Sequence, residues 1–143
     1  MKLNLDDYFI SDEKRLLSVA AIHDYLSRES YWARGRCREK VESSIAHSLC
    51  FGVYTREAVQ AGFARAVTDH ATTYYICDLF ILPAHRGQGL SKRLMEFIIG
   101  HPRLAGLSGL LLTRDAHALY RRYGFSDAKD VQARFMLKPR EQA

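Results

Sequence analysis

The chain has 143 residues, 48% of them hydrophobic and 26% charged, with a formal net charge of +5. This composition is ordinary for a globular protein, and the length allows a sizeable core, so we expect a single domain over residues 1–143. No segment has the length and apolar character of a membrane span or a signal segment. Cys37, Cys50 and Cys77 lack metal-ligand spacing, so we expect no metal site and free thiols in a cytoplasmic protein.

The surplus of 21 Lys and Arg residues over 16 Asp and Glu residues is compatible with a basic solvated surface. It is also compatible with attraction of an anionic cofactor. The positive charges do not gather into one run with interleaved aromatic residues. We therefore expect no nucleic-acid partner, although a basic nucleic-acid-binding domain stays as a third hypothesis.

The first part of the chain predicts alternating strands and helices. Weak alternation predicts a strand over residues 2–10, and apolar spacing predicts one helix beginning near Ser18 and another over residues 38–48. Residues 50–54 and 59–67 then predict strands, and the β-branched and aromatic run 72–82 predicts a long central strand. Because short turns join these three strands, we expect an antiparallel meander.

The segment between the two predicted helices, residues 28–38, holds the only tryptophan and four arginines. Two interpretations are open. The aromatic rings cover the edge of the core while the arginines are solvated, or the segment forms a wall of an acceptor site, as binding residues concentrate on loops. In the second case Tyr31 and Trp32 stack on the substrate, and Arg34 or Arg36 holds an acidic group.

Residues 78–91 predict a strand, a glycine-rich turn and an amphipathic helix. Gly87 and Gly89 let the backbone approach a ligand closely. The first N–H groups of the helix and its dipole face the turn, and Arg86 adds a cation, so the turn is suited to a phosphate or pyrophosphate. It lacks both the Gly-Lys-Ser/Thr ending of a P-loop and the third glycine of the dinucleotide fingerprint.

The last part of the chain predicts a strand, a helix and a strand. Residues 109–113 form a continuous apolar run, typical of a strand buried on both faces and parallel to the central strand. Asp115 is expected to cap a helix over residues 116–123, which Gly124 ends. Residues 133–137 predict the final strand.

The glycine-rich turn resembles the acyl-CoA loop of the GNAT superfamily of N-acetyltransferases. The family pattern is Gln/Arg-x-x-Gly-x-Gly/Ala, and the chain reads Arg86-Gly87-Gln88-Gly89-Leu90-Ser91, with Ser91 in place of Gly or Ala. A second stretch resembles the C-terminal signature Asn-x-x-Ala-x-x-Leu-Tyr-x-x-x-Gly-Phe. It is matched by Ala116, Leu119, Tyr120, Gly124 and Phe125, with Thr113 in place of Asn.

The resemblance implies an α/β fold with a mixed, mostly antiparallel sheet of about six strands, flanked by helices. The sheet would splay between the central strand and the strand at residues 110–112, where CoA enters. The backbone of the central strand would pair with the pantetheine arm, and the turn would hold the phosphates. The implied cofactor-binding residues are Phe80, Ile81, Leu82, Arg86, Gly87, Gln88, Gly89, Leu90, Ser91, Thr113 and Tyr120.

The implied reaction is direct transfer of an acetyl group from acetyl-CoA to a primary amine of a small molecule or amino-acid-like acceptor. Tyr120 would be the proton donor to the departing thiolate. Many members place a Glu on the central strand as the base, and here Asp78 is the only carboxylate available. A structural role for Asp78, a contribution of His117, and a water relay without a single base all stay open. Strand alternation places Cys77 and Asp78 on opposite faces.

A CoA-binding sensor or structural module without transferase activity is the alternative function. An intact Tyr120 weighs against this alternative, and the absence of a central-strand Glu weighs for it. The sequence leaves open the acceptor amine, the base and the oligomeric state, for which a homodimer is one option.

Overall fold

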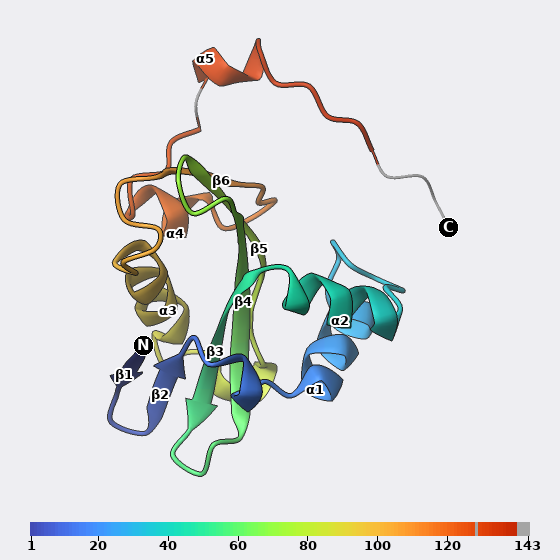
Figure 1. Ribbon diagram of the computed structural model, residues 1–143, viewed down its shortest axis with the longest axis vertical. Helices are drawn as coiled ribbons and strands as arrows, with labels where there is room; N and C mark the ends of the chain where they lie inside the picture. Colours follow the sequence, from blue (N-terminus) through green and yellow to red (C-terminus); the bar gives the residue numbers. More distant parts are fainter. Residues whose placement is uncertain (128, 140–143) are drawn as a thin grey trace. The chain divides into compact units, whose positions relative to one another are not determined.

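The computed structural model describes residues 1–127 and 129–139, and contacts group the chain into two compact units, Met1–Leu112 and Thr113–Ala143. The first unit is built on a six-stranded sheet in the order β1-β2-β3-β4-β5-β6 (Figure 1). Neighbouring strands are antiparallel except β5 and β6, which are parallel. The strands are β1 (Lys2–Asn4), β2 (Tyr8–Ser11), β3 (Leu49–Thr55), β4 (Gln60–Thr68), β5 (Thr73–Ile81) and β6 (Ser108–Leu111).

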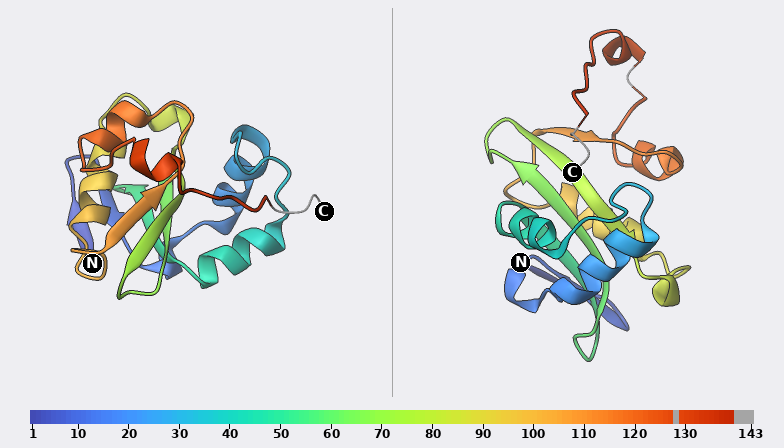
Figure 2. Two further views of the ribbon diagram at one scale, coloured as in Figure 1. Left: turned by 90° about the horizontal axis from the view of Figure 1, so that it is seen from above. Right: turned by 90° about the vertical axis from the view of Figure 1, so that its right-hand side faces the viewer.

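Helices cover both faces of this sheet. On one face, α1 (Val19–Asp24), the single π-helical turn η2 (Tyr25–Glu29) and α2 (Arg38–Ala46) lie in front of the strands in the right-hand view of Figure 2. Their buried residues share one apolar core with Cys50, Phe63 and Phe80 of the sheet. On the other face, α3 (Leu90–Ile99) sets Phe97 edge-on against Phe51 of β3. Short 3₁₀ turns, η1 (Lys14–Leu16) and η3 (Pro83–His85), complete this unit.

Local sequence explains where these elements begin and end. The hydroxyl of Ser18 accepts the N–H of Ala21 and caps α1. Gly89, with a φ of 72°, makes the sharp entry into α3, and Gly100 follows its last residue. The expected helix starts, the antiparallel meander and the parallel strand after α3 are all confirmed.

A β-bulge interrupts β5. Phe63 pairs with Phe80 and Arg65 pairs with Cys77, so one residue of β4 faces two residues of β5 between these pairs. Asp78 is one of the two, and its φ of 54° lies in the left-handed region that residues with a Cβ rarely adopt. Because the bulge shifts the alternation, Cys77 lies opposite Arg65 while Asp78 also bonds to Arg65. The expectation that Cys77 and Asp78 face opposite ways is therefore wrong.

The strands β5 and β6 separate halfway along β5. Their parallel pairing covers residues 73–76 of β5, whereas β5 continues beside β4 as far as Ile81. Within the described part of the chain, no strand pairs with the β6-facing edge of residues 77–81. The expected splay between the central strand and the strand that follows α3 is confirmed, and it leaves backbone hydrogen-bonding groups of β5 unpaired along this edge.

Three predicted strands differ from the structure. Residues 2–10 form two strands rather than one, because a turn at Asp6 and Asp7, closed by the Leu5 N–H on the Tyr8 carbonyl, folds the segment into a hairpin. Residues 133–137 form no strand. The strand predicted to be buried on both faces, β6, is the last in the sheet, and Leu110 and Leu112 are 55% and 61% exposed.

The second unit contains α4 (His117–Arg121) and α5 (Lys129–Gln132). The hydroxyl of Thr113 accepts the N–H of Ala116 just before α4. The expected cap by Asp115 is wrong, because no side chain caps the N-terminal residue of α4 and the threonine satisfies the nearby donor instead.

Candidate active site

The glycine-rich turn between β5 and α3 is open toward solvent. Gly87 and Gly89 have φ values of 81° and 72°, and a Cβ added to either would meet no atom within 4 Å. The first backbone hydrogen bond of α3 runs from the N–H of Arg93 to the carbonyl of Gly89. The N–H groups of Leu90 and Ser91 therefore have no acceptor inside the helix and point past its N-terminus. This arrangement fits an anion.

Arg86 connects the turn to the opposite helical layer. Its Nε donates to the Ile81 carbonyl at 3.0 Å, and its Nη2 donates to the Tyr25 hydroxyl at 3.0 Å. The Tyr25 ring, in η2, stacks on Phe80 with centroids 4.0 Å apart. The guanidinium predicted to bind phosphate thus also fixes the end of β5 against η2. Within the described part of the chain its Nη1 makes no hydrogen bond and can serve a ligand.

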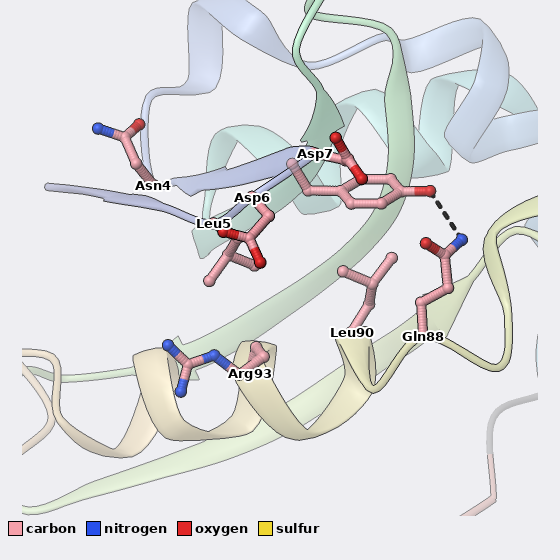
Figure 3. A pocket seen from close by; sticks show the side chains of 8 residues that line it. Asn4, Leu5, Asp6, Asp7, Gln88, Leu90 and Arg93 are labelled. Atoms are coloured by element: carbon pink, nitrogen blue, oxygen red, sulfur yellow. Dashed lines mark hydrogen bonds between the residues drawn. The ribbon is translucent and has the colours of Figure 1, made fainter.

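The side chain of Gln88 points away from the glycine-rich turn, toward β2. Its Nε2 donates to the Tyr8 hydroxyl at 2.9 Å (Figure 3). That hydroxyl also lies 3.0 Å from Nδ1 of His85. In the cofactor role predicted for Gln88, only its backbone N–H remains for the phosphates.

Gln88 and Tyr8 border a cavity of about 460 Å³ between the β1–β2 hairpin and the start of α3 (Figure 3). The cavity is lined by Asn4, Leu5, Asp6, Asp7, Tyr8, Gln88, Leu90 and Arg93. Two carboxylates against one guanidinium disfavour an anionic group there, so this cavity is a poor place for the phosphates.

Asp78 is the centre of a buried charged cluster on the α1–α2 side of β5. One carboxylate oxygen accepts the Trp32 indole N–H at 3.0 Å. The other accepts Nη1 of Arg36 at 2.8 Å and Nε of Arg65 at 2.6 Å. Burial lowers the pKa of Arg65, but the charge and hydrogen bond of Asp78 outweigh it, so that this pKa is raised overall. Both oxygens of Asp78 are thus engaged, which weighs against its predicted role as the base.

The cluster brings together predicted residues that are 42 to 46 positions apart in the sequence. Trp32 and Arg36, predicted in the acceptor wall, meet the predicted base Asp78. The neighbours Tyr31 and Arg34 are exposed, and the ring of Tyr31 packs edge-on against Trp32. Sequence reasoning missed Arg65, although a lone arginine within the apolar strand β4 was a usable signal.

Tyr120 is held by the way α4 ends. Gly124 has a φ of 86°, the N–H of Phe125 donates to the Tyr120 carbonyl, and the N–H of Gly124 donates to the Arg121 carbonyl. This is a Schellman motif, and the expected contact between its first and last residues is the edge-on packing of Tyr120 and Phe125, with centroids 6.2 Å apart. The spacing of Tyr, Gly and Phe in the signature therefore fixes the tyrosine ring at the helix end.

Residues 18–125, more than half of the chain, match the model of the "Acetyltransferase (GNAT) family". The chain belongs to this family. It is an acetyltransferase of the GNAT type.

A Gibberella zeae sequence described as an acetyltransferase, FG08082, is 29% identical over 87% of this chain and 82% of its own length. A GNAT-family crystal structure from Xanthomonas campestris pv. campestris is 39% identical, covers 95% of both chains and gives a TM-score of 0.90. A Clostridium acetobutylicum structure with acetyl-CoA has the same fold at 14% identity, with a TM-score of 0.63 over 98% of this chain and 96% of its own.

The residues present fit the cofactor of a GNAT acetyltransferase. The turn has room at both glycines, and the first N–H groups of α3 are available. No described strand pairs with the free edge of residues 77–81, on which Arg86 bonds only to the Ile81 carbonyl. Among the described residues, no three His, Cys, Asp or Glu side chains gather as metal ligands. None of the helices described is long and apolar enough to cross a membrane.

Proposed function

We propose that the protein is an acetyl-CoA-dependent N-acetyltransferase that acts on a primary amine of a small molecule or amino-acid-like acceptor. One observation carries the proposal. An unpaired edge of β5 leads directly into an open glycine-rich turn and the free N-terminus of a ten-residue helix. An extended amide-bearing arm and a pyrophosphate need these two features in this order.

The main chain does most of the cofactor binding in this proposal. Backbone groups of Phe80, Ile81 and Leu82 would hold the pantetheine amides as an added strand, and one N–H would face the thioester oxygen. The N–H groups of residues 87–91 would hold the phosphates, with Nη1 of Arg86 as a further donor. Bound acetyl-CoA supplies the activated acetyl group.

Tyr120 is the proposed proton donor to the departing thiolate. Its ring is fixed by the Schellman motif, which limits the positions open to its hydroxyl. Thr113, predicted to contact the cofactor, is proposed instead to order the start of α4 through its bond to Ala116. Because both oxygens of Asp78 are engaged, we propose that the acceptor ammonium loses its proton to water rather than to this carboxylate.

The engaged state of Asp78 also favours, to a lesser degree, the alternative of a CoA-binding module without transfer. The two functions share the cofactor site and differ only in turnover. They are separated by measuring thiol release from acetyl-CoA in the presence of amines.

The first experiment is calorimetric titration with acetyl-CoA of the wild-type protein and two turn variants. Gly89→Trp fills the open turn. Ser91→Asp places a carboxylate in the first turn of α3, where it stabilises the helix but repels phosphate. Ser91→Asn is the matched control, because it has the same shape without the charge.

We expect micromolar binding by the wild type and by Ser91→Asn, and a loss of about 100-fold or more in the other two variants. Circular dichroism establishes that all four proteins are folded. Absence of binding by the folded wild type would refute both the transferase and the sensor. Binding without thiol release over a panel of amines would refute the transferase alone.

A further inference from the structure

The cluster around Asp78 points to the chemistry of the acceptor. We propose that the acceptor amine carries a carboxylate and that Arg36, supported by Arg65, binds it. The inference rests on the proposed transferase function and names the substrate class of that site.

The charges of the cluster do not balance. Two guanidinium groups share one carboxylate, and the three side chains are 13% exposed for Arg36, 13% for Arg65 and 2% for Asp78. Among the described residues, Asp78 is the one carboxylate within ion-pair distance of either arginine. A net positive charge with so little hydration is stabilised by a second anion. The described residues supply no carboxylate for this purpose besides Asp78.

The arginines retain donors for such an anion. A guanidinium has five N–H donors. Within the described part of the chain, Arg36 uses Nη1 on Asp78, while Arg65 uses Nε on Asp78 and Nη1 on Ser48. Among the residues described, the Tyr54 hydroxyl is the one fully buried side-chain polar atom that makes no hydrogen bond. The remaining guanidinium nitrogens are therefore not buried without a partner, and they reach solvent. Nε and Nη2 of Arg36 can together bind a carboxylate in bidentate fashion.

The cluster lies beside the proposed reaction centre. Cys77 is the first residue of the unpaired β5 edge and lies opposite Arg65 in the β4–β5 pair. Asp78, the centre of the cluster, is the second residue of this edge and bonds to both Arg36 and Arg65. A carboxylate on Arg36 would therefore hold an amine a few bonds away near the backbone proposed to bind the thioester.

Three features of the fold keep the arginines in place. Trp32 holds Asp78 from the loop, and the carbonyl of Arg36 lies 3.1 Å from Nε2 of His23. The left-handed backbone of Asp78 turns its carboxylate toward both arginines. Polyamines and other acceptors without an anionic group would meet the same surplus positive charge and be repelled.

The test compares acceptors that differ only in this charge. The twenty standard amino acids and their α-carboxamides are assayed by thiol release with saturating acetyl-CoA. We expect the preferred amino acid to exceed its carboxamide by about tenfold or more in kcat/KM, because a hydrogen-bonded charge is lost in the amide. Thermal-shift titration with the same compounds measures binding without turnover.

Variants assign the preference to the arginine. Arg36→Gln is expected to abolish the preference of acid over amide while leaving Asp78 paired with Arg65. Arg36→Lys, which keeps the charge, is expected to restore part of it. Arg28→Gln is the matched control, since it removes a nearby but solvated charge that pairs with Asp24.

The outcomes separate this inference from the proposed function. Equal or faster acetylation of the carboxamides, or an acid preference that survives in Arg36→Gln, would overturn the inference and leave the transferase intact. Thiol release with none of the compounds, but with simple amines, would do the same. No release with any amine, despite acetyl-CoA binding, would refute the transferase and the inference with it.

Discussion

The two halves of the candidate site are built in different ways. The proposed cofactor side consists of main chain, with an unpaired strand edge, two glycines of positive φ and the first N–H groups of α3. The proposed acceptor side consists of side chains that converge from a loop, β4 and β5 on Asp78. Main-chain sites tolerate side-chain changes that leave the backbone path intact, whereas a buried cluster of charges depends on each member.

The two sides are joined by a single side chain. Arg86 belongs to the cofactor turn, yet it bonds to the hydroxyl of Tyr25 in the layer that carries the acceptor loop. Tyr25 in turn stacks on Phe80, whose backbone is proposed to bind the pantetheine arm.

The largest effect is expected on the acceptor side. Asp78→Ala leaves two buried guanidinium groups without their counter-ion, and we expect it to lower the free energy of unfolding by about 3–5 kcal/mol. Urea denaturation measures this change. Asp24→Ala breaks an exposed ion pair as a control and is expected to cost less than about 1 kcal/mol. Similar stability losses in the two variants would mean that the cluster is solvated.

Tyr120→Phe tests the proposed proton donor. The ring can still pack on Phe125, so the fold and the acetyl-CoA affinity should be kept, while loss of the hydroxyl lowers kcat by about 100-fold or more. Steady-state thiol release and calorimetry measure the two quantities. Tyr123→Phe is the control on the same turn of chain. An unchanged kcat would reduce Tyr120 to a packing role.

Sequence reasoning succeeded for the local backbone features of the candidate site. Glycine spacing, an apolar run and a helical repeat are local, so the turn, α3, the meander and the splay could all be predicted. The Tyr-Gly-Phe spacing was likewise local, because a Schellman motif spans only a few residues. Edge position is not local, and for that reason the exposure of Leu110 and Leu112 in β6 could not be predicted.

The acceptor cluster could not be predicted as a whole. Its members were named separately, as a base and as a loop wall, because nothing in the sequence pairs Trp32 or Arg36 with Asp78. The bulge causes this difference, because it places an extra residue in β5. The regular alternation that put Cys77 and Asp78 on opposite faces of the sheet therefore does not hold. The residue with positive φ in the bulge is Asp78 rather than a glycine. The sequence therefore lacks the glycine that usually marks a bulge of this kind.

A smaller effect is expected from cutting the link between the two sides. Tyr25→Phe keeps the ring on Phe80 but removes the acceptor of Arg86, and we expect acetyl-CoA affinity to fall by about fivefold, the net value of one hydrogen bond of about 1 kcal/mol. Calorimetry measures it. Tyr75→Phe, which removes a hydroxyl from the exposed part of β5, serves as the control. An unaltered affinity would show that Arg86 needs no support from η2.

The smallest effect on stability is expected at the turn between β4 and β5, which binds a carboxylate with its N–H groups as the cofactor turn is proposed to bind a phosphate. Between β4 and β5, a carboxylate of the chain itself fills the place that a phosphate would take, since Asp69 accepts the Thr72 hydroxyl and the N–H groups of residues 71–73. These hydrogen bonds, that of the Thr72 side chain foremost, hold the pKa of Asp69 well below its ordinary value.

A lowered pKa in the folded state means that the ionised carboxylate stabilises the fold above the pKa of the unfolded chain, near pH 4, and that this contribution is lost as the pH falls further. Asp69→Asn keeps a side-chain oxygen as acceptor but cannot titrate. The difference in unfolding free energy between wild type and Asp69→Asn should therefore be constant from pH 7 to about pH 5 and shrink below about pH 4. Urea denaturation at each pH measures it. A difference that persists unchanged to low pH would mean that the N–H groups of this turn do not need the charge, and the contrast with the open cofactor turn would then rest on geometry alone.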